Sequence, residues 1–281
     1  KTILEPSLYL EKIIDYFNLK AKKLDKFKKL EEEIVHFKRI KYLRNEKIDK
    51  LLKDIKKVEL FDKKEKVIEQ LRLDFEKYKD LDWYDREKEK IDSLYIKESK
   101  FKDLKIKYLT NHYYLPVILS EKEKIDYVAH IINISSEVRF IEELENYILE
   151  DSNFFKHFDW WLFSKIDEDL DEVYIPYYNS KLNRISKFKP DFIFWLKKED
   201  NYYIIFIDPK GTEHADAYRK IDGFKKLFGD DNRGKKFEFN GINIMVKLLL
   251  KPKDIADTLI EYRKYWFSSF DDLKDKMEIN I

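Results

Sequence analysis

Two aspartates and a lysine are the residues whose types and spacing could do chemistry. Asp191 follows Pro190 and precedes the apolar run FIFWL, and Asp208 ends the run YYIIFI just before Pro209 and Lys210. A charged group at the end of a strand-like apolar run is costly to bury unless it is paired or binds a metal ion. The placement of these carboxylates therefore suggests that each has a charged partner or a metal ion.

The two apolar runs are expected to pair as an antiparallel hairpin around the polar stretch 197–201. If the hairpin folds symmetrically about its midpoint, Asp191 stands directly across from Asp208, and opposed residues share one face of a sheet. Because side chains alternate along a strand, Lys210 falls on the same face as Asp208. We therefore expect two carboxylates and an ammonium group to converge.

This combination of groups indicates metal-dependent hydrolysis. Two nearby carboxylates repel each other, and a divalent cation between them removes that repulsion. Hard oxygen ligands suit Mg²⁺, for which Mn²⁺ can substitute. Lys210 would orient and polarise the attacking water or hold the scissile phosphate, while the metal stabilises the charge that develops on phosphorus.

The pattern Pro190-Asp191 with Asp208-Pro209-Lys210 resembles the PD-(D/E)xK nuclease superfamily. Longer stretches resemble the C-terminal nuclease region of type III restriction subunits and related helicase-nucleases: SSEVRFIEELENYI, WWLFSKIDEDLDEVYIPYY, KFKPDFIFWL and YYIIFIDPKGTEHADAYRKIDGF. The resemblance covers roughly residues 108–281. It implies a restriction-endonuclease-like fold, an Mg²⁺-dependent deoxyribonuclease that cuts double-stranded DNA, and a role in restriction-modification or antiviral defence.

The resemblance also implies a helicase motor elsewhere in the full polypeptide or in another subunit. No GxxxxGK[ST] phosphate loop occurs in this sequence, so any motor is expected outside it. The first residue is lysine rather than methionine, so we expect a fragment of a longer chain or a processed form.

Members of the superfamily usually draw another acidic residue from a helix that precedes the sheet. Four glutamates of the expected helix 136–149 are candidates: Glu137, Glu142, Glu143 and Glu145. Only Glu137 lies on the apolar stripe of that helix, together with Ile141 and Leu144, so we choose it as the third metal ligand. Its alternative role is that of a carboxylate favoured at a helix N-terminus by the macrodipole.

Other polar residues near the pattern are weaker candidates. His130 and His214 have no metal-ligand spacing with another histidine, so both are interpreted as ordinary polar residues. Tyr218 and Lys220 begin a helix after the lysine motif and could touch backbone phosphate, although a solvated helix face is the simpler interpretation.

The elements that must position the candidate residues belong to an α/β domain over residues 108–281. Strands are predicted at 160–166, 172–178, 188–196, 201–209 and 242–250, and helices at 136–149, 215–228 and 253–268. Strands interleaved with helices predict a mixed sheet flanked by helices.

Residues 1–107 predict an all-α arm. After Pro6 this region has neither glycine nor proline, and apolar residues such as Leu24, Phe27, Leu30 and Ile34 recur at helical spacing. Long helices packed as hairpins or as a coiled coil would serve either as a structural spacer or as a surface for phosphate or a partner protein.

Composition narrows the class of protein. The 281 residues include no cysteine, which excludes disulfides and thiolate zinc sites. No apolar run is long enough to span a bilayer and no signal peptide is recognisable, so a cytoplasmic protein without a membrane partner is expected.

The formal charge of +1 conceals an asymmetry along the chain. Residues 1–110 hold 31 Lys and Arg against 24 Asp and Glu, and the remaining residues hold 26 against 32. A basic part beside a carboxylate-bearing part fits a nucleic-acid contact surface joined to a metal site. The alternative is a non-enzymatic module that docks a partner or holds DNA, with Asp191 and Lys210 reduced to a salt bridge.

Overall fold

The computed structural model describes residues 28–29, 51, 53–58, 77, 79, 81, 83–86, 97–109, 111–112, 114–115, 117–120, 131–166, 173–209, 217–229, 236–239, 242–251 and 259–277. The chain divides into two compact units. Unit 1 comprises Lys1–Lys26 and Ser136–Ile281, and unit 2 comprises Phe27–Ser135. The sequence predicted a boundary near residue 107, whereas the two units divide after Ser135.

Unit 1 is built on a mixed five-stranded sheet. Its strands, in spatial order, are β12 (Lys236–Phe239), β13 (Ile242–Leu250), β11 (Asn201–Asp208), β10 (Phe192–Lys198) and β7 (Trp160–Lys165). β13 runs parallel to β11, and the other neighbours are antiparallel. The predicted α/β class with a mixed sheet is confirmed for this unit.

The two central strands are apolar on both faces. In β10 the residues Phe192–Leu196 are all buried, and in β11 the residues Tyr203–Asp208 are all buried. Strands covered on both faces lose the polar and apolar alternation of a half-exposed strand, which explains the continuous apolar runs in the sequence.

Helices cover both faces of the sheet. On one face lies α5 (Ser135–Leu149), whose Phe140 ring stacks on Phe192 at 4.9 Å between centroids. The short helix η1 (Phe154–His157) lies on the same face, since its Phe155 ring stacks on Trp161. On the other face lies α6 (Ala217–Phe228), which reaches the sheet through the edge strand β12.

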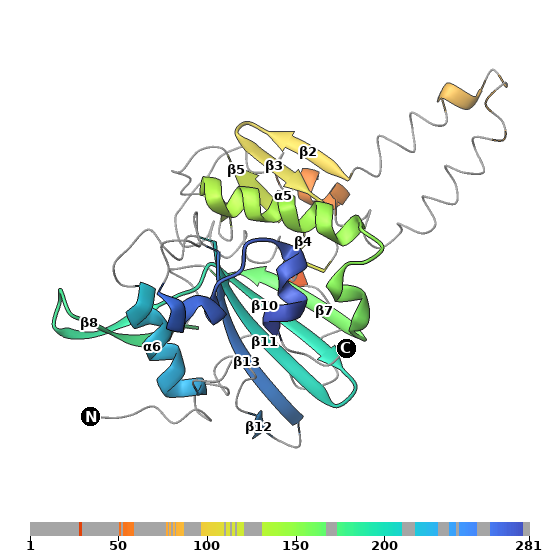
Figure 1. Ribbon diagram of the computed structural model, residues 1–281. Coiled ribbons are helices and arrows are strands. Elements are labelled where there is room, and N and C mark those ends of the chain that lie inside the picture. Colours follow the sequence, from red (N-terminus) through yellow and green to blue (C-terminus); the bar gives the residue numbers. More distant parts are fainter. Residues whose placement is uncertain are drawn as a thin grey trace. The chain divides into compact units, whose positions relative to one another are not determined.

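A two-stranded ribbon follows β7 along the chain. It consists of β8 (Ile175–Asn179) and β9 (Arg184–Phe188), here called the β8–β9 hairpin. Helix α6 packs so closely on β8 that a Cβ atom at Gly223 would lie 2.3 Å from the carbonyl oxygen of Pro176. Figure 1 shows the hairpin extending past α6.

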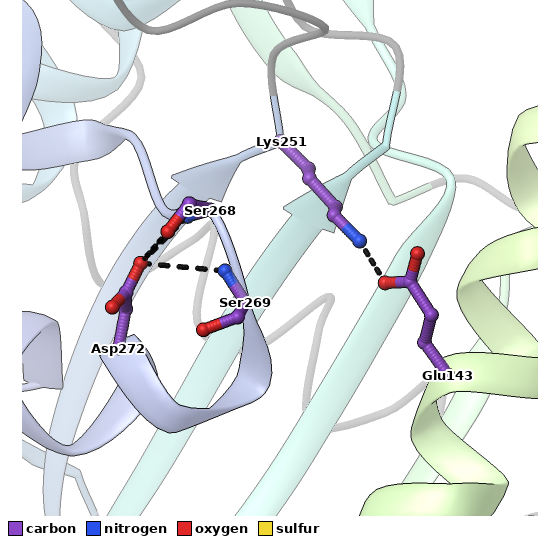
Figure 2. A network of polar contacts seen from close by, with 5 residues as sticks. All are labelled: Glu143, Lys251, Ser268, Ser269 and Asp272. Carbon is purple, nitrogen blue, oxygen red and sulfur yellow. Dashed lines mark hydrogen bonds and ion pairs between the residues drawn. The ribbon is translucent and has the colours of Figure 1, made fainter.

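Residues 259–268 do not form the second part of the predicted helix 253–268, whose first part, 253–258, lies outside the described residues. The described C-terminal part consists of η2 (Ile260–Tyr265), η3 (Phe270–Asp272) and α7 (Leu273–Met277). The Phe270 ring packs on the Tyr147 ring of α5 at 5.3 Å between centroids. The start of η3 is capped by Asp272, whose Oδ2 accepts hydrogen bonds from the hydroxyl and backbone N–H of Ser268 and from the backbone N–H of Ser269 (Figure 2).

Unit 2 contains a four-stranded sheet of β2 (Glu98–Phe101), β3 (Leu104–Lys107), β5 (Val117–Ser120) and β6 (Ile131–Ile132). The short strand β1 (Lys28–Lys29) pairs in parallel with β4 (Tyr114–Leu115). Residues 51, 53–58 and 84–86 are helical, and Leu51, Ile55 and Val58 are buried at helical spacing.

The prediction of an all-α arm over 1–107 is therefore wrong at its end, where residues 98–107 form a β-hairpin. Leu104 and Ile106 are buried and alternate with half-buried lysines, which is the two-residue period of a strand. The turn places Lys102 at φ 53° without the glycine that usually marks such a turn. The stripe from Leu24 to Ile34 lies outside the described residues.

Within the ranges given above, no helix has both the length and the apolar character needed to cross a membrane.

Candidate functional site

The hairpin formed by β10 and β11 has the predicted register. Phe192 opposes Ile207, and the pairing continues residue by residue to Lys198 and Asn201 at the turn. Continued by one residue in the other direction, the same register sets Asp191 opposite Asp208. Opposed Cβ atoms of an antiparallel pair lie about 4.5–5.5 Å apart, so this extended register would bring the two carboxylates within reach of one cation.

Neighbouring strands fix the main chain at both aspartates. The backbone N–H of Ile166 donates to the carbonyl of Asp191 at 2.8 Å, so Asp191 continues the ladder between β7 and β10. The backbone N–H of Lys251 donates to the carbonyl of Asp208 at 3.0 Å, just beyond the pairing of Asp208 with Leu250. Asp208 is buried, with 6% of its surface exposed, and Asp191 is half-buried.

The aspartates point away from α5. Phe192 contacts α5 and opposes Ile207, so both side chains lie on the α5 face of the sheet. Asp191 and Asp208 are their chain neighbours, and alternation along the strands directs them to the opposite face, which α6 covers. Lys210 lies outside the described residues, and its position beside the two aspartates stays a prediction.

Glu137 points inward from α5, as its place on the apolar stripe predicted. Its side chain is fully buried, whereas Glu142 is exposed and Glu143 and Glu145 are half-buried. Its Oε2 pairs with the Nζ of Lys165 at 2.6 Å. Lys165 ends β7 and opposes Phe192, so this ion pair lies on the α5 face of the sheet.

The structure therefore does not assemble the three carboxylates that the sequence suggested. Among the residues that the structure describes, no group of three or more His, Asp and Glu side chains is placed to hold a metal ion. Glu137 and the aspartate pair lie on different faces of the sheet, and Lys165 neutralises the glutamate. The pair Asp191 and Asp208 remains as the candidate site.

A second lysine–glutamate pair joins α5 to the sheet beside Asp208. The Nζ of Lys251 pairs with the Oε2 of Glu143 (Figure 2). Burial and then the positive charge of Arg139 lower the pKa of Lys251, whereas the ion pair favours its charged form. Sequence reasoning overlooked Lys165 and Lys251, although each follows a strongly apolar run, as Asp208 does.

Of the remaining candidate residues, two have structural contacts and two lie outside the described residues. Tyr218 accepts a hydrogen bond from the backbone N–H of Leu259, and its ring packs on that of Tyr262 at 4.7 Å, so it braces the C-terminal segment. Lys220 lies over the Phe188 ring at 4.4 Å, at the base of the β8–β9 hairpin. His130 and His214 lie outside the described residues.

Comparison with known proteins gives one match. Residues 128–262 match the sequence model of the YagJ family, over slightly less than half of the chain. The matched segment contains α5, the β8–β9 hairpin and the strands from β7 to β13. Searches of curated proteins and of solved structures found no match.

Proposed function

We propose that unit 1 is a metal-dependent endonuclease domain with a restriction-endonuclease-like fold, which hydrolyses DNA phosphodiester bonds at Asp191, Asp208 and Lys210. The observation that supports the proposal is the register of β10 and β11, which pairs Phe192 with Ile207. Extended by one residue, this register would set the two aspartates opposite each other at one edge of the sheet. This is the arrangement expected if the resemblance to PD-(D/E)xK nucleases reflects a shared site. A role in restriction or defence, together with a helicase motor or subunit, belongs to the same proposal.

The residues at this edge fit a magnesium or manganese ion. Two opposed carboxylates in buried surroundings supply hard oxygen donors, and their mutual repulsion favours a cation between them. When bound, the metal would polarise a phosphate oxygen and activate water. Asp191 and Asp208 would hold it, and Lys210 would orient the water or stabilise negative charge on the phosphate.

Glu137 is the weakest member of the proposed ligand set. Its carboxylate already pairs with Lys165 on the other face of the sheet. The same observation favours the rival proposal, a DNA-holding module without activity, because that module needs no third ligand.

Cleavage of plasmid DNA in the full-length protein tests the proposal. We expect Asp208→Ala and Lys210→Ala each to lower Mg²⁺-dependent cleavage by at least roughly 100-fold, the effect of losing one electrostatic stabiliser. Binding of a DNA duplex in EDTA should be largely unchanged, because these residues act at the reaction and not in general phosphate attraction.

Matched controls come from the turn of the same hairpin. Asp200→Ala and Lys198→Ala remove one carboxylate and one ammonium group near the opposite ends of β10 and β11. Both controls should cut like the wild type. Undiminished cleavage by Asp208→Ala or Lys210→Ala would end the nuclease assignment at this site and favour the DNA-holding module.

A further inference from the structure

The β8–β9 hairpin is uniformly basic. Between Glu172 and Asp191 the sequence holds four basic residues and no acidic one: Lys181, Arg184, Lys187 and Lys189. Lys181, Arg184 and Lys187 are exposed, and these three form no ion pair with another residue that the structure describes. A cluster of like charges without counter-charges repels itself, so it is stable only where it meets water or an anionic partner.

The outer face of the hairpin adds apolar side chains to this charge. Tyr178 and Ile185 oppose each other there and are 46% and 66% exposed, and Leu182 in the turn is 54% exposed. The Lys187 ammonium group lies on the same face, over the ring of Tyr174 at 4.4 Å. Helix α6 packs on the other side of the ribbon, against Tyr177, and leaves the outer face exposed.

The turn of the hairpin is held by its own hydrogen bonds. The backbone N–H of Leu182 donates to the Oδ1 of Asn179 at 3.1 Å, and the Tyr178 hydroxyl donates to the Oδ1 of Asn183 at 2.7 Å. Asn183 adopts φ 46°, a conformation that asparagine tolerates better than most residues. A prearranged ribbon loses little conformational entropy when it binds.

The hairpin is also connected to the candidate site. Its last residue, Phe188, is followed by Lys189, Pro190 and then Asp191. Lys220 of α6 adds a further positive charge over the Phe188 ring. A ligand that follows the basic ribbon toward its base therefore approaches Asp191.

We propose that the outer face of the β8–β9 hairpin binds duplex DNA and guides it to the aspartate pair; the choice of DNA as the ligand rests on the proposed function. Lys181 in the turn and Lys187 contact phosphates, and the apolar side chains of Leu182 and Ile185 enter a groove. Arg184, which opposes Asn179 beside the turn, adds positive charge from the other side of the ribbon. A two-stranded ribbon fits the major groove, which is about 12 Å wide, and apolar side chains there can contact the methyl groups of thymine.

Binding of a fluorescent mixed-sequence DNA duplex by the full-length protein in EDTA tests this inference. For Lys181→Ala/Arg184→Ala/Lys187→Ala we expect an affinity loss of about tenfold or more at low salt. The slope of log affinity against log salt should fall by roughly 0.9 for each lost phosphate contact. The variant Leu182→Ser/Ile185→Ser should weaken binding while keeping the salt slope, because it removes no charge.

The matched control is Lys156→Ala/Lys198→Ala/Lys226→Ala, which removes the same charge from unit 1 outside the hairpin. An equal loss in this control, or wild-type binding by the hairpin variant at an unchanged melting temperature, would overturn the inference. Tighter binding to an RNA duplex of the same sequence would overturn the choice of DNA. Cleavage by the wild type and by Asp208→Asn separates the two proposals. If DNA binding depends on the hairpin but neither of these proteins cuts DNA, only the nuclease proposal fails.

Discussion

At the scale of single residues, the molecule places charged groups at the ends of apolar strands and gives them different partners. Lys165 ends β7 and neutralises Glu137, and Lys251 follows β13 and pairs with Glu143. Asp208 ends β11 and faces Asp191 through the hairpin register. The two lysines at the ends of β7 and β13 pair with glutamates of α5, and strand alternation directs the two aspartates to the opposite face of the sheet.

Loss of Lys165 alone should destabilise the protein strongly, whereas replacing both Glu137 and Lys165 with apolar residues should cost little stability. We expect Lys165→Met to lower the free energy of unfolding by about 3–5 kcal/mol, because it removes the positively charged partner of a fully buried carboxylate. The double variant Glu137→Leu/Lys165→Met should recover most of that loss, since no buried charge remains. Urea unfolding measures both values.

The pair of half-buried Lys197 and exposed Asp159, with 3.9 Å between its charged atoms, provides the control. Lys197→Met should cost less than about 1 kcal/mol. A double variant as unstable as Lys165→Met alone would show that packing, and not charge, sets the cost.

The carboxylate of Asp272 should give the fold a dependence on acid. Burial alone would raise its pKa, but the hydrogen bonds from Ser268 and Ser269 and the charge of Lys276 outweigh burial and lower the pKa. A carboxyl whose pKa is lower in the folded chain stabilises the fold above its unfolded pKa, and that contribution is lost as the pH falls through the folded pKa. Asp272→Ala should therefore lower stability by about 1 kcal/mol at neutral pH.

The measurement is the melting temperature of the wild type and of Asp272→Ala from neutral pH down into the range where carboxylates are protonated. The two curves should converge at the acid end. Asp271→Ala, an exposed neighbour, should follow the wild type throughout. A constant difference between wild type and Asp272→Ala at every pH would contradict the role of its charge.

At the scale of elements, the interface between α6 and β8 depends on one missing side chain. In an open helix, replacing glycine by alanine stabilises by roughly 0.5–1 kcal/mol. At Gly223 the new Cβ would lie 2.3 Å from the Pro176 carbonyl oxygen and 2.9 Å from the Tyr177 Cβ. These atoms belong to the backbone or are fixed to it, so the helix or the ribbon must move.

Gly223→Ala should therefore destabilise the protein by about 1–3 kcal/mol, the usual cost of overpacking. Lys226→Ala on the exposed side of the same helix should change stability by less than about 0.5 kcal/mol. Chemical denaturation of both variants provides the test. A stabilising Gly223→Ala would mean that helix and ribbon do not touch here.

Sequence patterns predicted the strands whose two faces are buried, and missed strands of the exposed ribbon and of unit 2. The buried run INIMVKLLL gave β13 with its bounds, and FIFWL and YYIIFI gave the correct register. The strand β9, RISKF, was missed because four of its five residues are not buried, which leaves no apolar alternation to detect. The turn between β2 and β3 was also missed, since Lys102 adopts a positive φ where glycine or asparagine is the usual signal.

The candidate site was predicted in part for the same reason. Hairpin symmetry correctly gave the register from Phe192 and Ile207 to the turn, because register follows from turn length, and the position of Asp191 across from Asp208 stays a prediction that extends this register by one residue. The inward direction of Glu137 was also correct, but helical periodicity says only that a side chain is buried and not what it meets. Its partner Lys165 comes from a strand 28 residues further along, which no local pattern connects.

At the scale of the whole molecule, binding of a metal ion should raise the free energy of unfolding of the protein. A ligand that binds only the folded state raises the free energy of unfolding, by about 2.7 kcal/mol at a concentration of 100 times its Kd. If Asp191 and Asp208 share a cation, Mn²⁺ or Mg²⁺ should raise the melting temperature of the protein as its concentration increases, in the absence of DNA. Asp191→Asn and Asp208→Asn should each abolish that increase, because the remaining carboxylate is a single ligand.

When the metal is removed, the melting temperature of these variants should no longer fall below that of the wild type. In EDTA, Asp208→Asn should melt at or above the wild-type temperature, because it relieves the repulsion between the two carboxylates. Glu137→Gln tests whether Glu137 is a third metal ligand. If the metal raises the melting temperature of this variant as much as that of the wild type, Glu137 serves only its pair with Lys165. If the increase is lost, Glu137 belongs to the ligand set. An Mn²⁺ response that survives both Asp191→Asn and Asp208→Asn would place the metal elsewhere and remove the physical basis for hydrolysis at this edge of the sheet.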